Sequence, residues 1–527
     1  MPNEACVLAV DLGTSGCKTA LVTLDGRVLA WRFQAVETLL FPNGGAEQRP
    51  QDWWDALTNT TRALLAEGGV PAESIRAVCC STQGEGTVPV DREGAALANC
   101  ILWMDSRGAP YLHRHTRGLI NVEGYSLPRL IQWLRLTGGA PSATGKDPAS
   151  HMLYVRDAMP EVYAKTHKFL NVLDYLNLRL TGRFVATYDS ILTSWVTDNR
   201  DASNLRYHDG LLRASGIDRD KYPDIVPCTE VIGELTQEVC AALGLPRPVP
   251  VVAGSIDNTA AAVGSGAVRD FEPHLYIGTS SWLTAHVPFK KTDIFTEMAS
   301  VPCAVPGRYL FMAMQTTAGG NLTFLRDKIL YHKDELLQEA EAPDVYKILD
   351  RIAESTPPGS NGVIYTPWIY GERSPIKDSH IRAAIHNLSL ENSRADIIRA
   401  FLEGVAYNTR WLLGPFEKNL KRPSGAIRFA GGGAASGIWC RILADVLDRP
   451  IQQCADPIQV NARGAAYIAG VGLGELQFDD VPGLVQYQQT YEPDPANRAL
   501  YDDRFGIFTQ LYEANKKIYR KLNPHAD

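Results

Sequence analysis

The sequence lacks three features that would place it at once in a large class of proteins. No run approaches the roughly 18 consecutive apolar residues that a membrane span requires, so we expect no membrane partner. No cluster of lysine and arginine has the pattern of a nucleic-acid-binding surface, and the formal net charge of the 527 residues is −7. We therefore expect no nucleic-acid partner, and any anionic ligand must be held by local groups.

The ten cysteines are scattered and form no Cys-x-x-Cys pair, which indicates neither a disulfide framework nor a zinc site. Cys79, Cys80 and Cys240 lie in apolar surroundings, as expected of core thiols in a reducing cytoplasm. The N-terminal residues lack the basic region of a signal peptide, and the first apolar run soon reaches Asp11. We therefore expect a cytoplasmic protein, and a homodimer is compatible with the sequence.

One short motif occurs in both halves of the chain. The copies are Asp11-Leu-Gly-Thr-Ser-Gly-Cys-Lys18 and Tyr276-Ile-Gly-Thr-Ser-Ser281, and each lies between two apolar runs. An apolar run, a small polar turn and a second apolar run predict a β-hairpin. Glycines let backbone N–H groups approach a ligand, and hydroxyl groups add donors, so such a turn suits a phosphate chain. Two turns indicate a duplicated fold that holds one nucleotide between its halves.

The first turn supplies candidate groups for a metal and for phosphate. The carboxylate of Asp11 is placed to hold Mg²⁺ against the phosphates, and the alternative is an Asx-turn residue that organises the hairpin. The residues expected to contact phosphate are Gly13, Thr14, Ser15, Gly16 and Lys18. Lys18 is expected to reach the terminal phosphate, although a solvated turn lysine is the alternative.

A second carboxylate, Asp257, follows the strand-like run Val251–Gly254. Phosphoryl transfer to an alcohol needs a base near the hydroxyl and little other covalent chemistry from the protein. We predict that Asp257 accepts that proton and also serves as a metal ligand, and that Asn258 hydrogen-bonds the substrate. The alternative is a helix N-cap, since Asp and Asn are both good caps.

The order of predicted elements indicates an α/β fold built twice. The first half begins with strands at Val7–Val10, Ala20–Thr23 and Val28–Phe33, followed by a helix from about Pro50. The second half repeats the strands and turn and contains a helix over residues 393–413. We place a first domain at residues 1–256, a second at 257–490 and a helical extension at 491–527.

Two polar clusters follow strand-like runs of the first half and could line a pocket for a polyhydroxyl compound. They are Gln83-Gly-Glu-Gly86 and Trp103-Met-Asp105-Ser-Arg107. Carboxylate and amide groups suit hydroxyls, and an aromatic face suits sugar C–H surfaces, although Trp103 could also be a core residue. A glycine-rich segment, Gly431-Gly-Gly-Ala-Ala-Ser436, precedes a predicted helix and is either a nucleotide contact or a tight turn.

Together these pieces resemble the FGGY family of carbohydrate kinases over nearly the whole chain. Seven motifs occur in the order of the family. Besides the two hairpin turns and the two polar clusters, they are Ala253-Gly-Ser-Ile-Asp-Asn258, Gly371-Glu-Arg-Ser-Pro375 and Ala430-Gly-Gly-Gly-Ala434.

The resemblance implies two actin-like, ribonuclease-H-like domains with an ATP and sugar cleft between them. It places the catalytic base at Asp257 and the metal and phosphate carboxylate at Asp11. It also implies adenine-side contacts at Gly432 and Gly433 and a phosphate contact from Thr279. We expect Gly278 and Ser436 to bind the nucleotide as well.

The sequence differs from the family where the sugar is bound. Xylulokinases typically show Gln-Met-His-Gly and glycerol kinases Gln-Arg-Glu-Thr, whereas this chain has Gln83, Gly84 and Glu85. We expect an ATP- and Mg²⁺-dependent kinase for the primary hydroxyl of a ketopentose such as xylulose. The substrate-side residues are then Gln83, Gly84, Glu85, Trp103, Asp105 and Asn258. The alternatives are a glycerol-like polyol kinase, an actin- or chaperone-like ATPase and a catalytically idle sugar sensor.

Overall fold

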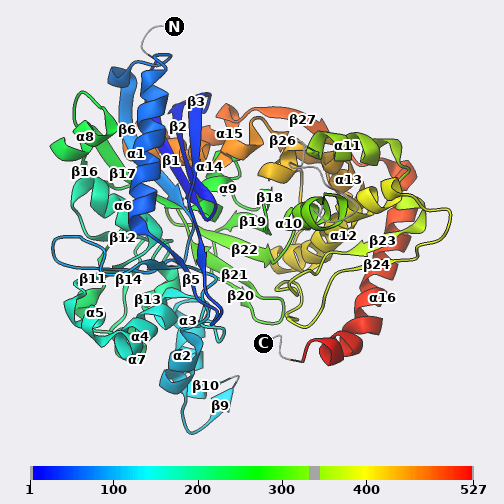
Figure 1. The fold of residues 1–527 in the computed structure, drawn as a ribbon, viewed down its shortest axis with the longest axis horizontal. Coiled ribbons are helices and arrows are strands. Elements are labelled where there is room, and N and C mark those ends of the chain that lie inside the picture. The colour runs from blue at the N-terminus through cyan, green and yellow to red at the C-terminus, as the bar shows by residue number, and fades with distance from the viewer. Residues whose placement is uncertain (1–3, 123, 332–344, 525–527) are drawn as a thin grey trace.

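The computed structural model describes residues 4–122, 124–331 and 345–524. Two central β-sheets stand side by side, each with helices on its faces, and they form two domains (Figure 1). The sheet of the first domain has the order β16 (Val231–Glu234), β17 (Pro250–Ile256), β6 (Ile75–Thr82), β1 (Cys6–Gly13), β2 (Gly16–Thr23) and β3 (Val28–Ala35).

The sheet of the second domain repeats the same core. Its order is β20 (Thr292–Asp293), β21 (Met298–Pro302), β22 (Tyr309–Gln315), β19 (Ser281–Val287), β18 (Pro273–Ile277), β25 (Ile427–Ala430), β26 (Ile451–Cys454) and β27 (Tyr487–Tyr491). In both sheets the first strand pairs antiparallel with the next strand in sequence and parallel with a later one. This repeat confirms the predicted α/β fold with two related domains.

Local sequence signals explain the helices on the outer faces. Helix α1 (Pro50–Ala66) begins at Pro50 as predicted, and its buried Trp53 and Leu57 pack against the outer face of the first sheet. Helices α6 (Val172–Thr181) and α8 (Gln237–Leu243) contribute to the same core. Helix α12 (Arg394–Leu420) begins with the predicted capping box, in which Ser393 and Asp396 satisfy backbone N–H groups at the first turn.

The second domain has its own core between its sheet and two further helices. Helices α12 and α13 (Gly437–Leu447) cover one face of the sheet, where Phe311, Phe401 and Phe429 are buried. The long C-terminal helix α16 (Arg498–Leu522) packs onto the same core through Tyr501 and Phe508. Helix α16 is therefore packed against the second domain.

Two helices lie between the sheets and join the domains. Helix α9 (Asp257–Gly264) and helix α14 (Val460–Gly472) share a core with the inner face of the first sheet and with strand β22. The two helices touch through glycines, because a Cβ atom on Gly264 would lie 1.9 Å from the carbonyl oxygen of Val460. A Cβ atom on Gly464 would lie 1.9 Å from the carbonyl oxygen of Ala260. Only glycine allows the backbones to approach this closely.

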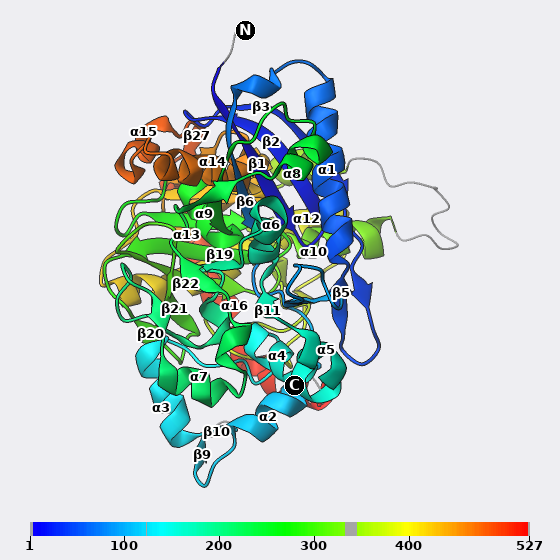
Figure 2. The ribbon, with the colours of Figure 1, turned by 90° about the vertical axis from the view of Figure 1, so that its left-hand side faces the viewer.

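The segment between β6 and β17 adds a group of small helices and strands that extends from the first domain, at the bottom of Figure 2. The helices of this segment, besides α6 and α8, are α2 (Ala109–Thr116), α3 (Leu127–Leu136), α4 (Pro148–Ala158), α5 (Pro160–Lys165) and α7 (Asp209–Ser215). Its minor strands are β7 (Val88–Val90), β8 (Cys100–Ile101), β9 (Asn121–Val122), β10 (Tyr125–Ser126), β11 (Lys168–Leu170), β12 (Val185–Thr187), β13 (Thr197–Asp198), β14 (Arg206–Tyr207) and β15 (Asp224–Val226).

Smaller elements complete the two domains. They are β4 (Leu39–Leu40), β5 (Ala46–Gln48), α10 (Gly320–Phe324), α11 (Tyr346–Ser355), β23 (Ile364–Thr366), β24 (Ala384–His386) and α15 (Val481–Leu484). Within the described ranges, no helix combines the length and apolar character needed to cross a bilayer. All ten cysteines are buried free thiols.

Candidate functional site

Asp11 lies near the end of β1, the first strand of the first hairpin, and is held from both domains. It pairs across the hairpin with Lys18, whose Nζ lies 3.3 Å from Oδ2 of Asp11. Asn461, at the start of α14, donates from Nδ2 to Oδ1 of Asp11 at 3.1 Å. Lys18 also donates to the carbonyl oxygen of Ile458 at 2.7 Å. The predicted metal carboxylate thus lies at the junction of the two domains, and Lys18 has protein partners there.

Asp257 is the first residue of α9 and follows strand β17 directly. Its Oδ1 accepts a hydrogen bond from the backbone N–H of Asn258 at 2.7 Å. Its pKa is raised from 3.8 to about 7, chiefly by burial and next by the nearby charge of Asp11, and the hydrogen bond from Asn258 opposes the shift. The side chain therefore stabilises the start of the helix and has a pKa close to neutral pH, which suits a general base.

A third carboxylate behind Asp257 was not predicted from the sequence. Asp189 is buried, and its Oδ2 accepts a hydrogen bond from the backbone N–H of Ile256 at 3.0 Å. Its Oδ1 accepts from the hydroxyl of Thr187 at 2.6 Å. Asp189 thereby fixes the end of β17 and the position of Asp257. Asn258 is buried beside it, and its Oδ1 accepts from the Thr259 hydroxyl at 3.4 Å.

The second predicted turn, at Gly278, Thr279 and Ser280, joins β18 to β19 as expected. Its carbonyl groups accept hydrogen bonds from a second loop that sequence analysis missed. The N–H of Gly319 donates to Gly278 at 2.9 Å, and the N–H of Gly320 donates to Thr279 at 3.0 Å. This loop leads into α10, so two glycine-containing segments lie together in the second domain.

The glycine segment before α13 packs against the second turn. Gly431 has a φ of +88°, and a Cβ atom there would lie 2.6 Å from the carbonyl oxygen of Ile277. Gly433 is packed against the same residue, whereas Gly432 is exposed with open space beside it. Ser436 caps α13 by accepting from the N–H of Trp439 at 3.2 Å. Its hydroxyl donates to Asp350 at 2.7 Å.

The turn of the first hairpin contacts the proposed substrate wall. The hydroxyl of Thr14 donates to Oε1 of Gln83 at 2.8 Å and accepts from Nε1 of Trp103 at 3.1 Å. The sequence predicted that Thr14 contacts the nucleotide and that Gln83 and Trp103 contact the substrate, and the structure brings the three into one hydrogen-bonded group. Gln48 was not singled out in the sequence analysis. Its Oε1 atom accepts a hydrogen bond from Nε2 of Gln83 at 2.9 Å.

Glu85 occupies a left-handed backbone conformation with a φ of +62°, which is uncommon for a residue with a side chain. Among the described residues, none donates a hydrogen bond to its carboxylate. Burial raises the pKa of Glu85 from 4.5 to about 7, and the positive charge of Arg373 in the second domain opposes this shift. At the neighbouring Gly84 a Cβ atom would lie in ordinary contact with Ile256, at 3.6 Å. A strained backbone and a carboxylate without a partner are features of ligand-binding positions.

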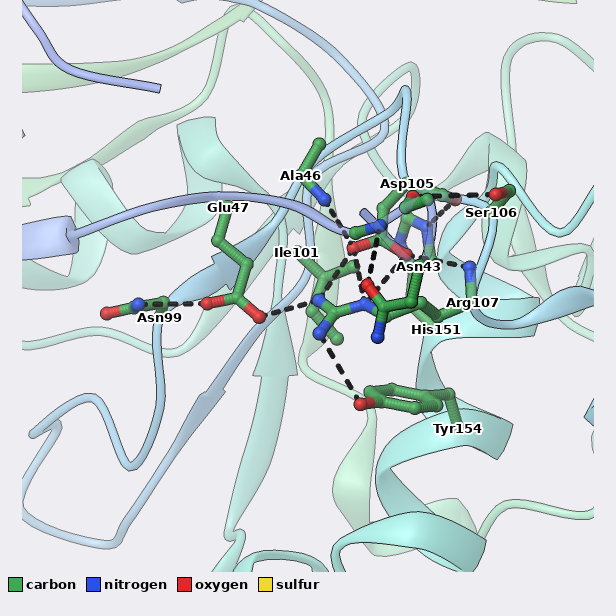
Figure 3. A network of polar contacts seen from close by, with 12 residues as sticks. Asn43, Ala46, Glu47, Asn99, Ile101, Asp105, Ser106, Arg107, His151 and Tyr154 are labelled. Carbon is green, nitrogen blue, oxygen red and sulfur yellow. Dashed lines mark hydrogen bonds and ion pairs between the residues drawn. The ribbon is translucent and has the colours of Figure 1, made fainter. Parts of the chain in front are cut away.

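Asp105 lies in a different environment from the one predicted. Its carboxylate is fully buried and accepts hydrogen bonds from the backbone N–H of Ala46 and from the guanidinium of Arg107 (Figure 3). Arg107 also donates to Glu47 at 2.6 Å and lies over the ring of Tyr154. Asp105 therefore orients Arg107 instead of offering free oxygen atoms to a substrate. The sequence could not distinguish this because both roles place a carboxylate at the end of a strand.

Comparisons with known proteins agree with this architecture. Models of the N-terminal and C-terminal domains of the FGGY family of carbohydrate kinases match residues 6–264 and 275–473. The chain is 26% identical to a xylulose kinase of Staphylococcus epidermidis, with 98% of each chain covered. It is 24% identical to a gluconokinase of Bacillus subtilis, with 98% and 97% covered.

A solved structure shows the same fold. The xylulose kinase of Rhodospirillum rubrum superposes with a TM-score of 0.80 at 26% identity, covering 98% of this chain and 99% of that one. The two family models together span most of the chain and meet between α9 and β18, the segment that connects the two sheets. The chain is a member of the FGGY family of carbohydrate kinases.

Proposed function

We propose that this protein transfers the γ-phosphoryl group of ATP to a primary hydroxyl of a ketopentose, with xylulose as the leading substrate. The observation that carries the proposal is Asp257, a carboxylate with a pKa of about 7. It lies at the start of an interdomain helix, near enough to Asp11 for the charge of Asp11 to raise that pKa. Relatives named xylulose kinase support the substrate class.

Asp257 would accept the proton of the attacking hydroxyl. A base with a pKa near the working pH is effective because a useful fraction is ionised while it still binds a proton well. The backbone N–H of Asn258 and the support of Ile256 by Asp189 hold the carboxylate in place. Phosphoryl transfer otherwise depends on the alignment of the two substrates and on groups that stabilise charge.

The residues present fit Mg²⁺ with ATP. Asp11 and Asp257 offer carboxylate oxygens of the kind that Mg²⁺ prefers, and this ion usually takes one or two carboxylates together with water and phosphate oxygens. We assign Asp11 and Asp257 as the two carboxylates, since they lie close enough for the charge of Asp11 to raise the pKa of Asp257. When bound, the ion would neutralise phosphate charge.

The nucleotide would lie between the two turns. On the side of the first domain the contacts are the backbone groups of Gly13 and Ser15, with Lys18 close by. On the side of the second domain we assign the phosphate contacts to Gly278 and Thr279 and the adenosine contacts to Gly432, Gly433 and Ser436. The exposed position of Gly432, with open space beside it, supports this assignment.

The substrate would be held by Gln83, Gly84, Glu85, Trp103 and Asn258. Glu85 is an acceptor for substrate hydroxyls because its carboxylate has no other hydrogen-bond donor among the described residues. An ionised carboxylate at this position also disfavours an acidic sugar such as gluconate. A glycerol-like polyol is the second candidate, since Glu85 matches the glutamate of glycerol kinases. We place the enzyme in the cytoplasm because all ten cysteines are free thiols.

A panel of ketopentoses, polyols and gluconate, assayed by ADP release, tests the proposal. We expect D-xylulose or another ketopentose to stimulate release well above the basal rate. The Asp257→Asn variant should lose about 10²- to 10⁴-fold in kcat and retain ADP binding, while the exposed Asp503→Asn variant should behave as the wild type. If no compound in the panel stimulates release, the proposed substrate class is wrong. If Asp257→Asn keeps full activity, the assignment of the base is wrong.

A further inference from the structure

The hydroxyl of Thr14 lies at a junction between the nucleotide turn and the substrate wall. It is hydrogen-bonded to Gln83 and Trp103, and the backbone carbonyl of Thr14 accepts from Nε2 of Gln48 at 2.7 Å. The Oε1 atom of Gln48 accepts from Nε1 of Trp53 at 3.0 Å and from Nε2 of Gln83 at 2.9 Å. These five side chains thus form the centre of one continuous network around the turn of the first hairpin, and Thr38 is bonded to Gln48 at its outer end.

The chemistry of this network allows a single arrangement of donors. An indole N–H can only donate and a backbone carbonyl can only accept. Trp53 therefore requires Oε1 of Gln48, and the carbonyl of Thr14 requires Nε2 of Gln48. Gln83 must then direct Nε2 to Gln48 and Oε1 to Thr14, which commits the Thr14 proton to Gln83. The hydroxyl oxygen receives the indole N–H of Trp103.

This arrangement changes the role expected for Thr14. Phosphate oxygens are acceptors, and the proton of the Thr14 hydroxyl is already donated to Gln83. The hydroxyl cannot bond to phosphate without breaking the network, so the turn must present its backbone N–H groups instead. The Thr14 hydroxyl donates to Gln83 and accepts from the indole N–H of Trp103, a residue that is 41% exposed.

We propose that the Thr14 hydroxyl is a positioning group that couples the two ligand sites. Nucleotide bound at the turn Gly13–Gly16 holds Thr14, and Thr14 holds the indole of Trp103 and the amide of Gln83 in the orientation that binds the substrate. The coupling is reciprocal, so substrate on Trp103 and Gln83 strengthens nucleotide binding at the turn. The inference deepens the proposed function. Of the two measurements below, the second rests on that function because it uses the proposed substrate.

Three variants isolate the hydroxyl. Thr14→Val keeps the shape of the side chain and removes the hydroxyl, whereas Thr14→Ser restores the hydroxyl and serves as rescue. Thr38→Val is the matched control, because the Thr38 hydroxyl accepts from Nε2 of Gln48 at the outer end of the same network, at 3.0 Å. Thr14→Ala replaces Thr14→Val if the latter does not fold, as judged by circular dichroism.

The first measurement needs no substrate. The enzyme is labelled with 5-fluorotryptophan, and the fluorine resonance of Trp103 is assigned from its loss in Trp103→Phe. Titration with MgADP should shift this resonance in the wild type, in Thr14→Ser and in Thr38→Val. In Thr14→Val the resonance should differ before ADP is added and should respond little. An unchanged resonance in Thr14→Val, or a wild-type resonance that ignores MgADP, overturns the proposal.

The second measurement is the coupling itself. The Kd of MgADP is determined by calorimetry with and without saturating D-xylulose. The loss of one neutral hydrogen bond should reduce the ratio of the two Kd values by about 3- to 10-fold in Thr14→Val, with recovery in Thr14→Ser. An equal ratio in wild type and Thr14→Val overturns the coupling. If D-xylulose does not bind at all, the proposed substrate is wrong, and the fluorine measurement still decides the role of Thr14.

Discussion

Asn461 in helix α14 donates a hydrogen bond to the carboxylate of Asp11 at 3.1 Å, although the two residues lie 450 positions apart in the sequence. The carbonyl of Ile458, just before the helix, accepts from Lys18 at 2.7 Å. The first hairpin is therefore fixed to the second half of the chain by two separate bonds. The placement of Asp11 depends on how the two domains meet and not on the hairpin alone.

Replacing Asn461 should impair the reaction without unfolding the protein. Asn461→Ala removes a single hydrogen bond to a charged group, and we expect kcat to fall by about 5- to 30-fold because Asp11 loses its fixed orientation. Asn461→Asp should be worse, since it places a second negative charge against Asp11. Steady-state kinetics with the substrate found in the panel measure both effects. Wild-type kcat in Asn461→Ala would show that Asp11 is held without this contact.

The contact between α9 and α14 should tolerate no side chain at its glycines. Gly264→Ala puts a methyl group 1.9 Å from the carbonyl oxygen of Val460, so the helices must separate. We expect a loss of about 2–3 kcal/mol in the free energy of unfolding and a lower kcat, because Asp257 begins α9. Urea denaturation and kinetics measure the two effects.

The control for this prediction is a glycine in a helix with free space around it. Gly506 lies in α16, where a Cβ atom would meet nothing within 4 Å. Gly506→Ala should therefore stabilise the protein by about 0.5–1 kcal/mol through helix propensity. Equal effects of Gly264→Ala and Gly506→Ala would contradict the inferred contact between the helices.

Glu372 joins three segments of the second domain, and its replacement should show which hydrogen bonds matter. The buried carboxylate accepts from the N–H of Thr316 at 2.9 Å, the N–H of Arg373 at 2.8 Å and Nδ2 of Asn408 at 2.6 Å. In Glu372→Gln the new amide must face one of these donors. Asn408 cannot turn over to compensate, because its Oδ1 accepts from Trp368 at 3.2 Å.

We therefore expect Glu372→Gln to cost about 1–3 kcal/mol of unfolding free energy. Glu391→Gln, an exposed change of the same chemistry, should cost nothing measurable. Chemical denaturation at neutral pH measures both variants. Thr316 begins the loop that contacts Thr279, and Thr279 is a proposed phosphate contact. The affinity for ADP should therefore also fall in Glu372→Gln. An unchanged stability would mean that Asn408 finds another acceptor.

The parts of the fold that follow from local patterns were predictable. The two hairpins, the start of α1 at Pro50 and the capping box of Ser393 each rest on residues close together in sequence. The repeat of a short turn motif was enough to indicate two related domains. In the structure, β1 pairs parallel with β6, and β18 pairs parallel with β25 in the same way, so the two sheets share one central arrangement of strands.

The candidate site was predictable only where a residue acts within its own motif. Asp189, Gln48 and Asn461 support the site from distant segments, and no local pattern announces a hydrogen bond between residues so far apart. Asp105 shows a related limit, because a polar residue at a strand end can face a pocket or a buried arginine, and Asp105 is hydrogen-bonded to Arg107. Thr14 shows the same limit, since its partners Gln83 and Trp103 follow two other strands, β6 and β8.

Glu85 should make substrate binding depend on pH. Burial raises its pKa to about 7, so the carboxyl is mostly protonated at pH 6 and mostly ionised at pH 8. An ionised carboxylate makes stronger hydrogen bonds with hydroxyl donors than a neutral one. We expect the KM for the substrate to fall by about 3- to 10-fold between pH 6 and pH 8. In Glu85→Gln, which cannot ionise, KM should stay flat over this range.

Stability should change in the opposite direction. A carboxyl whose pKa is higher in the folded state than in the unfolded state, where it is near 4.5, holds its proton more tightly when folded. Its contribution is full below pH 4.5 and is lost as the pH rises to about 7. The wild type should therefore lose stability relative to Glu85→Gln across that window, measured by urea denaturation at a series of pH values. If KM and stability vary with pH in the same way in the wild type and in Glu85→Gln, Glu85 does not titrate near neutral pH.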